Sequence, residues 1–178
     1  MTLEQAWAEA YLVQARSDFA AYGRLADEPG FPFCHSLHHL QMATEKLGKA
    51  IGLKSGWPLE RVRTTHAAFV PALRLLWSGP LPAHLEMERK ALWRRIQGLL
   101  PLAHEVQSLA PDLAGAGPNA EYPWGTNASD VRAPASYEFP LWHMLKQPMG
   151  VRLVTLTHVV LRDFEQIFGA PPSSRPES

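Results

Sequence analysis

The 178-residue sequence predicts an all-α protein. Apolar residues recur at steps of three and four through most of the chain, which is the spacing of one face of a helix. Segments that contain proline and glycine separate these stretches, and no alternating apolar–polar run predicts a β-strand. We therefore expect one helical domain over residues 1–169, followed by a disordered tail, rich in Pro and Ser, at residues 170–178.

The first two helices have the clearest signals. Thr2 and Gln5 have the spacing of a capping box, which predicts a helix over residues 2–25. Residues 27–30, Asp-Glu-Pro-Gly, end that helix because proline lacks an amide donor and glycine favours a turn. A second helix is expected over residues 33–53, where a narrow apolar seam steps three, four, three, four. The seam consists of Leu37, Leu40, Thr44, Leu47 and Ile51.

Four further helices follow from the same periodicity. They are expected over residues 64–77, where Pro71 limits or kinks the helix, 84–100, with a continuation from Pro101 towards 109, 141–146 and 149–168. Residues 111–140 contain five Pro and three Gly and show little periodicity. They predict a long loop before the last helices, and a loop of this length is uncommon unless it packs or has a function. Its segment 121–124, Glu-Tyr-Pro-Trp, favours packing.

Composition excludes several classes of protein. Apolar residues make up 46% of the chain, and six are Trp, which excludes wholesale disorder. No apolar run approaches the roughly 20 residues that span a bilayer, and the first residues lack the basic and apolar regions of a secretory signal. The single cysteine, Cys34, has no partner for an internal disulfide. We therefore expect a cytoplasmic protein with no membrane partner.

The net charge of zero conceals an uneven distribution of charged residues. Residues 46–95 include ten basic and three acidic residues, a surplus of +7, whereas residues 105–138 carry five acidic residues against Arg132, a surplus of −4. A basic half attracts phosphate groups, and an acidic half is its complement in a dimer. Ordinary solvated helix faces are the alternative explanation of both surpluses.

The segment at residues 38–50, HHLQMATEKLGKA, resembles the second-helix signature of HEPN domains, the "higher eukaryotes and prokaryotes nucleotide-binding" helical bundles. That signature reads approximately Q-x-A-x-E-K-x-x-K-A. The matching residues are Gln41, Ala43, Glu45, Lys46, Lys49 and Ala50. Residues 7–18 resemble the first helix of the family, and Thr65-His66 resembles the start of its T-H-x-x-x-L element.

The resemblance implies an up-down bundle of four or five helices, usually a homodimer. Members of the family include metal-independent ribonucleases, toxin partners of small nucleotidyltransferases, and inactive binding proteins. The leading hypothesis is therefore a HEPN-like dimeric module without a cofactor. It would associate with RNA or a nucleotide, or act as the partner of a nucleotidyltransferase in a toxin–antitoxin system.

The alternative hypothesis is a metal-independent ribonuclease. Catalytic relatives carry an Arg, four to six residues, and then a His near the last helix, and Arg152 and His158 have this spacing. The resemblance implies that His158 acts as the general base or acid, while Arg152 stabilises charge on the phosphate. Arg61 and His66 also fit the spacing.

A third hypothesis is a metal-dependent helical-bundle enzyme. His35 and His39 have the i, i+4 spacing that lets two imidazoles share one metal ion, and His38 lies beside them. No flanking Glu accompanies this pair as a base, and Cys34 has no second thiol near it. Exposed or helix-terminal histidines explain the cluster better, so we assign no metal ligand.

Overall fold

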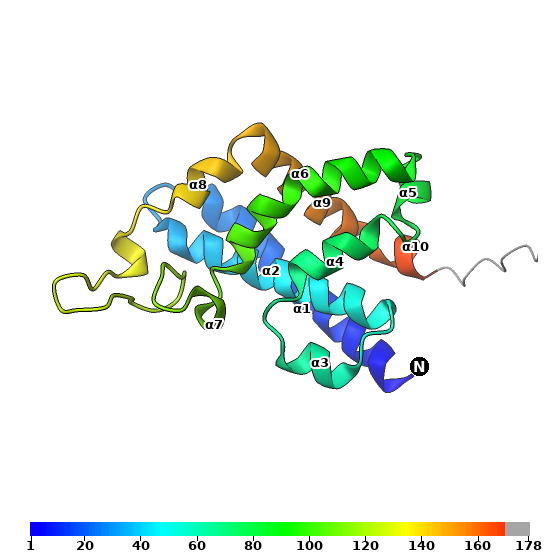
Figure 1. Ribbon diagram of the computed structural model, residues 1–178, viewed down its shortest axis with the longest axis horizontal. Coiled ribbons are helices and arrows are strands. Elements are labelled where there is room, and N and C mark those ends of the chain that lie inside the picture. The colour runs from blue at the N-terminus through cyan, green and yellow to red at the C-terminus, as the bar shows by residue number, and fades with distance from the viewer. Residues whose placement is uncertain (170–178) are drawn as a thin grey trace, which may run out of the picture.

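The computed structural model describes residues 1–169, and these residues form helices and loops without a β-strand, which confirms the all-α prediction (Figure 1). The elements are α1 (Leu3–Ala26), α2 (Phe33–Lys54), α3 (Leu59–Thr64), α4 (Phe69–Leu76), α5 (Leu81–His84), α6 (Arg89–Gln107), α7 (Pro111–Ala114), the 3-10 helix η1 (Pro134–Ser136), α8 (Pro140–Leu145), α9 (Pro148–Arg162) and α10 (Phe164–Phe168). The predicted tail, residues 170–178, lies outside the described residues. None of the described helices has the length and apolarity needed to cross a membrane.

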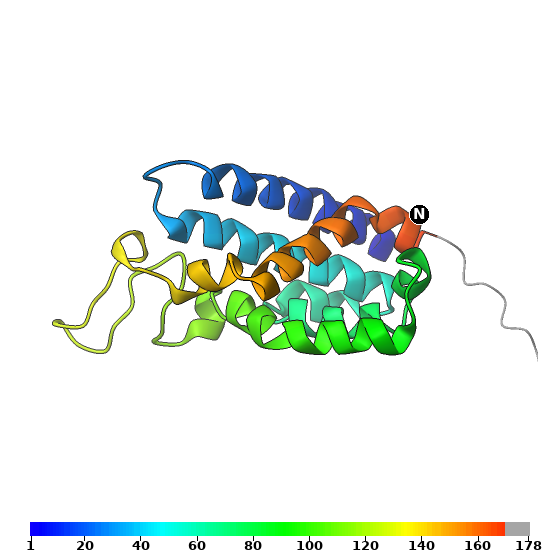
Figure 2. The ribbon, with the colours of Figure 1, turned by 90° about the horizontal axis from the view of Figure 1, so that it is seen from above.

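Five of these helices form the bundle. The helices α1 and α2 lie antiparallel and side by side along their whole length, as both ribbon views show (Figures 1 and 2). The opposite side of α2 packs against α4 and α6, and α9 crosses the bundle in contact with both α6 and α1. This arrangement confirms the predicted helical bundle and places α6 beside α9, although about 40 residues separate them in the chain.

The central element of the core is α2, of whose 22 residues 15 are buried. The predicted seam is buried throughout, from Leu37 to Ile51. Gly48 lets α4 begin directly on α2, because a Cβ atom at this position would lie 2.6 Å from the carbonyl carbon of Ala68. At the start of the chain, Thr2 and Gln5 form the predicted capping box of α1.

Three predicted helices are interrupted in the structure. The helix expected over residues 64–77 is right only from Phe69, because Thr65 is extended and its hydroxyl accepts a hydrogen bond from the backbone amide of Ala67. Pro71 lies in the first turn of α4. Backbone amides in a first turn have no acceptor within the helix, so a proline at this position breaks no helical hydrogen bond. The helix expected over residues 84–100 is continuous only from Arg89, because residues 85–88 separate α5 from α6. The helix expected over residues 149–168 is also interrupted, at Asp163 between α9 and α10.

The long loop projects from one end of the bundle (Figure 1). It contains α7 and η1 and closes on itself through paired backbone hydrogen bonds between Trp124 and Arg132. The Trp124 ring packs against Tyr137, with ring centroids 5.0 Å apart, and contacts the buried Phe139. The predicted packing of the segment 121–124 is therefore right for Trp124, whereas Tyr122 is 60% exposed.

Candidate functional site

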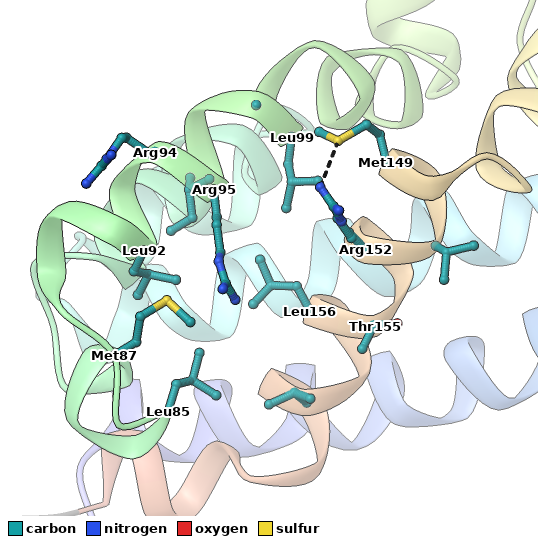
Figure 3. A pocket seen from close by; sticks show the side chains of 14 residues that line it. Leu85, Met87, Leu92, Arg94, Arg95, Leu99, Met149, Arg152, Thr155 and Leu156 are labelled. Atoms are coloured by element: carbon teal, nitrogen blue, oxygen red, sulfur yellow. Dashed lines mark hydrogen bonds between the residues drawn. The ribbon is translucent and has the colours of Figure 1, made fainter.

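A groove of about 690 Å³ lies between α6 and α9, and the segment after α5 closes one end of it (Figure 3). Its wall is mainly aliphatic and sulfur-containing. The residues that shape it include Leu85, Met87, Leu92, Leu99, Met149 and Leu156. Small-molecule sites in proteins commonly enclose about 300–1,000 Å³, so this groove is large enough for a ligand.

Local sequence explains why the groove exists. Leu153 and Val160 of α9 are fully buried in the core, whereas Leu156 on the same apolar stripe is only half-buried and lines the groove. On α6, Gly98 presents no side chain, and a Cβ atom there would lie 3.3 Å from the terminal methyl group of Met149. The two helices therefore leave apolar surface between them that no other described element covers.

Three arginines line this apolar groove. Arg94 and Arg95 come from α6, Arg152 comes from α9, and Figure 3 shows Arg95 and Arg152 extending over the wall. Arg152 donates to the sulfur of Met149 at 3.7 Å, and Nε of Arg94 donates to the carbonyl of Lys90 at 3.4 Å. Within the described part of the chain, none of the three guanidinium groups forms an ion pair.

Arg16 on α1 and Arg162 at the end of α9 do have carboxylate partners. Arg162 donates to both carboxylate oxygens of Asp163 at 2.6 Å, and Arg16 donates to Glu165 at 2.9 Å. The Arg162 guanidinium, followed by His84, holds the pKa of Asp163 well below its usual range. The groove arginines lack such a partner, as do most arginines of residues 1–169, and they differ from the others in lying together at one apolar groove. Such groups bind anions, and a guanidinium matches the oxygens of a phosphate group in pairs.

The structure places Arg152 and His158 on different sides of α9. Arg152 lines the groove towards α6, whereas the His158 ring packs on Phe19 of α1, with ring centroids 5.7 Å apart. Six residues of a helix turn the chain so that these side chains point about 120° apart. A single chain therefore does not bring the two residues of the ribonuclease hypothesis together.

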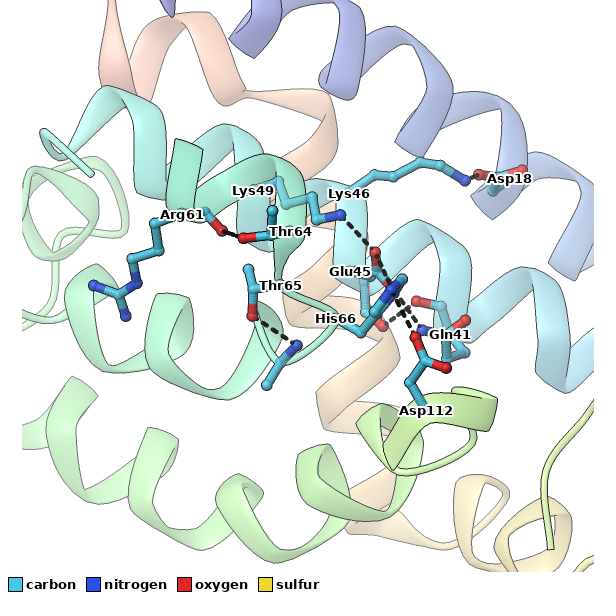
Figure 4. Close-up of polar contacts among 12 residues, drawn as sticks. Asp18, Gln41, Glu45, Lys46, Lys49, Arg61, Thr64, Thr65, His66 and Asp112 are labelled. Atoms are coloured by element: carbon cyan, nitrogen blue, oxygen red, sulfur yellow. Dashed lines mark hydrogen bonds and ion pairs between the residues drawn. The ribbon is translucent and has the colours of Figure 1, made fainter. Parts of the chain in front are cut away.

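The α2 segment whose sequence resembles the HEPN signature forms a buried polar cluster instead (Figure 4). Glu45 accepts hydrogen bonds from Gln41 at 2.9 Å and Lys49 at 2.8 Å, and the Glu45 and Lys49 side chains are only 10% and 7% exposed. Nδ1 of His66 lies 3.4 Å from the Glu45 carboxylate, and its Nε2 lies 3.0 Å from Asp112 of α7. These residues connect α2 to the segment before α4 and to α7.

Lys46 of the same segment connects α2 to α1. Its ammonium group lies 2.6 Å from the carboxylate of Asp18. The same carboxylate also accepts a hydrogen bond from the side-chain amide of Gln14 at 3.2 Å. Asp18 is buried, so this pair holds two helices together away from bulk water. The charged residues that carry the resemblance thus contact other parts of the bundle, and none of them lines the groove.

The three neighbouring histidines contact different groups, although the rings of His38 and His39 lie with their centroids 5.4 Å apart. His35 packs on Phe31, Nδ1 of His38 lies 3.4 Å from Glu121, and Nδ1 of His39 lies 3.6 Å from Asp18. Burial lowers the pKa of His38. In the described range 1–169, no three His, Cys, Asp or Glu side chains are arranged to hold a metal ion.

Sequence reasoning identified Arg152 and counted Arg94 and Arg95 within the basic half, but it did not place the three together. The available signal was the pair Arg94-Arg95, in a stretch of α6 that has no acidic residue before Glu105. Comparison with protein-family models, curated proteins and solved structures found no match for this chain.

Proposed function

We propose that this chain is a HEPN-like helical binding module that holds the phosphate groups of a nucleotide or an RNA strand in the groove between α6 and α9. The observation that carries the proposal is the set of three arginines in one groove, contributed by two helices and without a carboxylate partner among residues 1–169. Arginine binds phosphate groups well, because two of its N–H groups donate to two phosphate oxygens at once.

The surroundings of the groove support an anionic ligand. The exposed part of α6 that leads to it also carries Arg89 and Lys90, which have no ion-pair partner among residues 1–169. Positive charge gathered beside a low-dielectric wall attracts anions and raises their local concentration. The resemblance of the α2 segment to a nucleotide-binding family supports the same class of ligand.

The proposal includes association with other chains. A homodimer, and a nucleotidyltransferase as a possible partner protein, are what the resemblance implies. Light scattering of the purified protein measures the first, and co-purification with a nucleotidyltransferase encoded beside it measures the second. A monomer at every accessible concentration would remove the dimer from the proposal and leave the groove unaffected.

A titration with ADP and with a short single-stranded RNA tests the phosphate site. We expect the wild-type protein to bind, and the double variant Arg95→Gln/Arg152→Gln to bind at least tenfold more weakly, because charge-assisted hydrogen bonds contribute about 1.5–3 kcal/mol each. The matched control is Arg24→Gln/Lys54→Gln, which removes the same charge from exposed positions outside the groove. Equal losses in both double variants, or no binding by the wild type, would contradict the proposal.

A further inference from the structure

The chemistry of the groove wall selects among ligands that carry phosphate. Of the described residues that line it, Thr155 is the one uncharged polar side chain, and none is aromatic. The rest of the wall, apart from the arginines and Gly98, consists of Leu, Ile, Val and Met side chains. The surface beside the three positive charges is therefore almost purely aliphatic.

Such a wall suits an alkyl chain better than a nucleobase. The edges of a base carry donors and acceptors, which lose free energy when they are buried without partners. A base also gains most from stacking on an aromatic ring, and this groove offers none. An alkyl chain has no such requirements, and each methylene that it buries strengthens binding by a factor of up to about four.

The shape and charge of the groove favour the same ligand. The groove lies between two helices, and the thioether side chains of Met87 and Met149 in its wall adapt to an irregular apolar surface (Figure 3). A second copy of the chain seated here about a two-fold axis would bring two sets of three uncompensated arginines together. Like charges that meet across an interface disfavour it.

We propose that the ligand of this groove is an acylated nucleotide. Its fatty-acyl chain lies along the aliphatic wall between α6 and α9, and its phosphate groups bind Arg95 and Arg152 at the edge of that wall. This inference rests on the proposed function, because it takes the nucleotide phosphates as the groups that the arginines hold, and it adds the chemistry of the part that enters the groove.

The test is a binding series with free coenzyme A and its butanoyl, octanoyl and dodecanoyl thioesters, below their micelle concentrations. We expect weak binding of coenzyme A and an affinity that rises at least twofold per added methylene until the chain fills the groove. Leu156→Asn places an amide on the wall and is expected to flatten this series. Val13→Asn, at an exposed position on α1, is the matched control and is expected to keep the full series.

The outcomes separate this inference from the proposed function. If the affinity does not depend on chain length but coenzyme A binding still depends on Arg95 and Arg152, the acyl part of the ligand is wrong and the phosphate site stands. No binding of any nucleotide overturns both. If dodecyl phosphate binds as tightly as dodecanoyl-coenzyme A, the inference that the ligand contains a nucleotide is wrong. If light scattering shows that the wild type is a dimer and that Leu156→Asn is a monomer, the inference is wrong, because a second copy of the chain would then cover the groove.

Discussion

Two basic regions of this molecule differ in how their charges are compensated. In the cluster on α2, Lys49 and Lys46 each lie within 2.8 Å of a carboxylate, in surroundings that are largely buried. In the groove between α6 and α9, Arg95 and Arg152 have no carboxylate partner among residues 1–169 and face an aliphatic wall. A cation that the fold has already paired holds the bundle together, whereas an unpaired one beside a groove is available to a ligand.

Removal of the central carboxylate of the α2 cluster is expected to have the largest effect. Glu45→Ala leaves the Lys49 ammonium group buried without its partner, which costs about 3–5 kcal/mol of unfolding free energy. Urea unfolding followed by circular dichroism measures the loss. The control is Glu165→Ala, which breaks the exposed pair with Arg16 and is expected to cost at most about 1 kcal/mol. Similar losses in both variants would show that the α2 cluster is not a buried structural unit.

Two glycine substitutions compare the packing of the same two regions. Gly48→Ala forces a methyl group against the backbone of Ala68, and we expect a loss of about 1–3 kcal/mol of unfolding free energy. Gly98→Ala meets only the flexible end of Met149, so the gain in helix propensity, up to about 1 kcal/mol, is expected to leave the protein as stable or more stable. Thermal unfolding of both variants measures the contrast. A destabilised Gly98→Ala protein would mean that the groove wall is as rigid as the core.

Alanine substitutions at Arg152 and His158 test the ribonuclease hypothesis against the groove. Of these two residues, Arg152 lines the groove and His158 does not. We therefore expect Arg152→Ala to weaken nucleotide binding about tenfold and His158→Ala to leave it unchanged. RNA incubated with high concentrations of each protein in EDTA provides the second readout. Cleavage by the wild type that both substitutions abolish would instead establish a metal-independent ribonuclease, in which a second chain brings the two residues together.

The smallest effect is the pH dependence that arises at Asp163. Hydrogen bonds from Arg162 and His84 hold the pKa of this carboxyl below that of an unfolded chain. Its contribution to stability is therefore complete above the unfolded pKa of about 4 and is lost as the pH falls further. We expect the unfolding free energy of Asp163→Asn to vary less between about pH 5 and pH 2 than that of the wild type. Parallel curves for the two proteins would contradict this assignment.

The sequence was informative where structure is local. The capping box at Thr2 and the seam of α2 follow from spacing alone, because the groups involved lie within one or two turns. The break before α4 does not follow from the helical period, because it depends on a single hydroxyl, that of Thr65.

The candidate site was predictable only in part for the same reason. Arg152 was identified from the family resemblance, but its neighbours Arg94 and Arg95 lie more than 50 residues earlier in the chain. Their proximity depends on how α9 crosses α6, which side-chain packing decides. Conversely, Glu45 and Lys49 form an i, i+4 pair that is usual on a helix surface, and only the fold shows that this pair is buried.

The interruption at Asp163 has a consequence for how the groove responds to what occupies it. The Asp163 carboxylate lies 2.9 Å from His84 of α5, so the C-terminal end of α9 is attached to the segment whose Leu85 closes the groove. At the other end, the space beside Gly98 is bounded by the terminal methyl group of Met149, the end of a flexible side chain. One end of the groove is thus held by a side-chain hydrogen bond, and the other is bounded by a methionine that can change its rotamer. We expect an occupant that outgrows the groove to displace this methionine, while the spacing of the helices at the first end stays fixed.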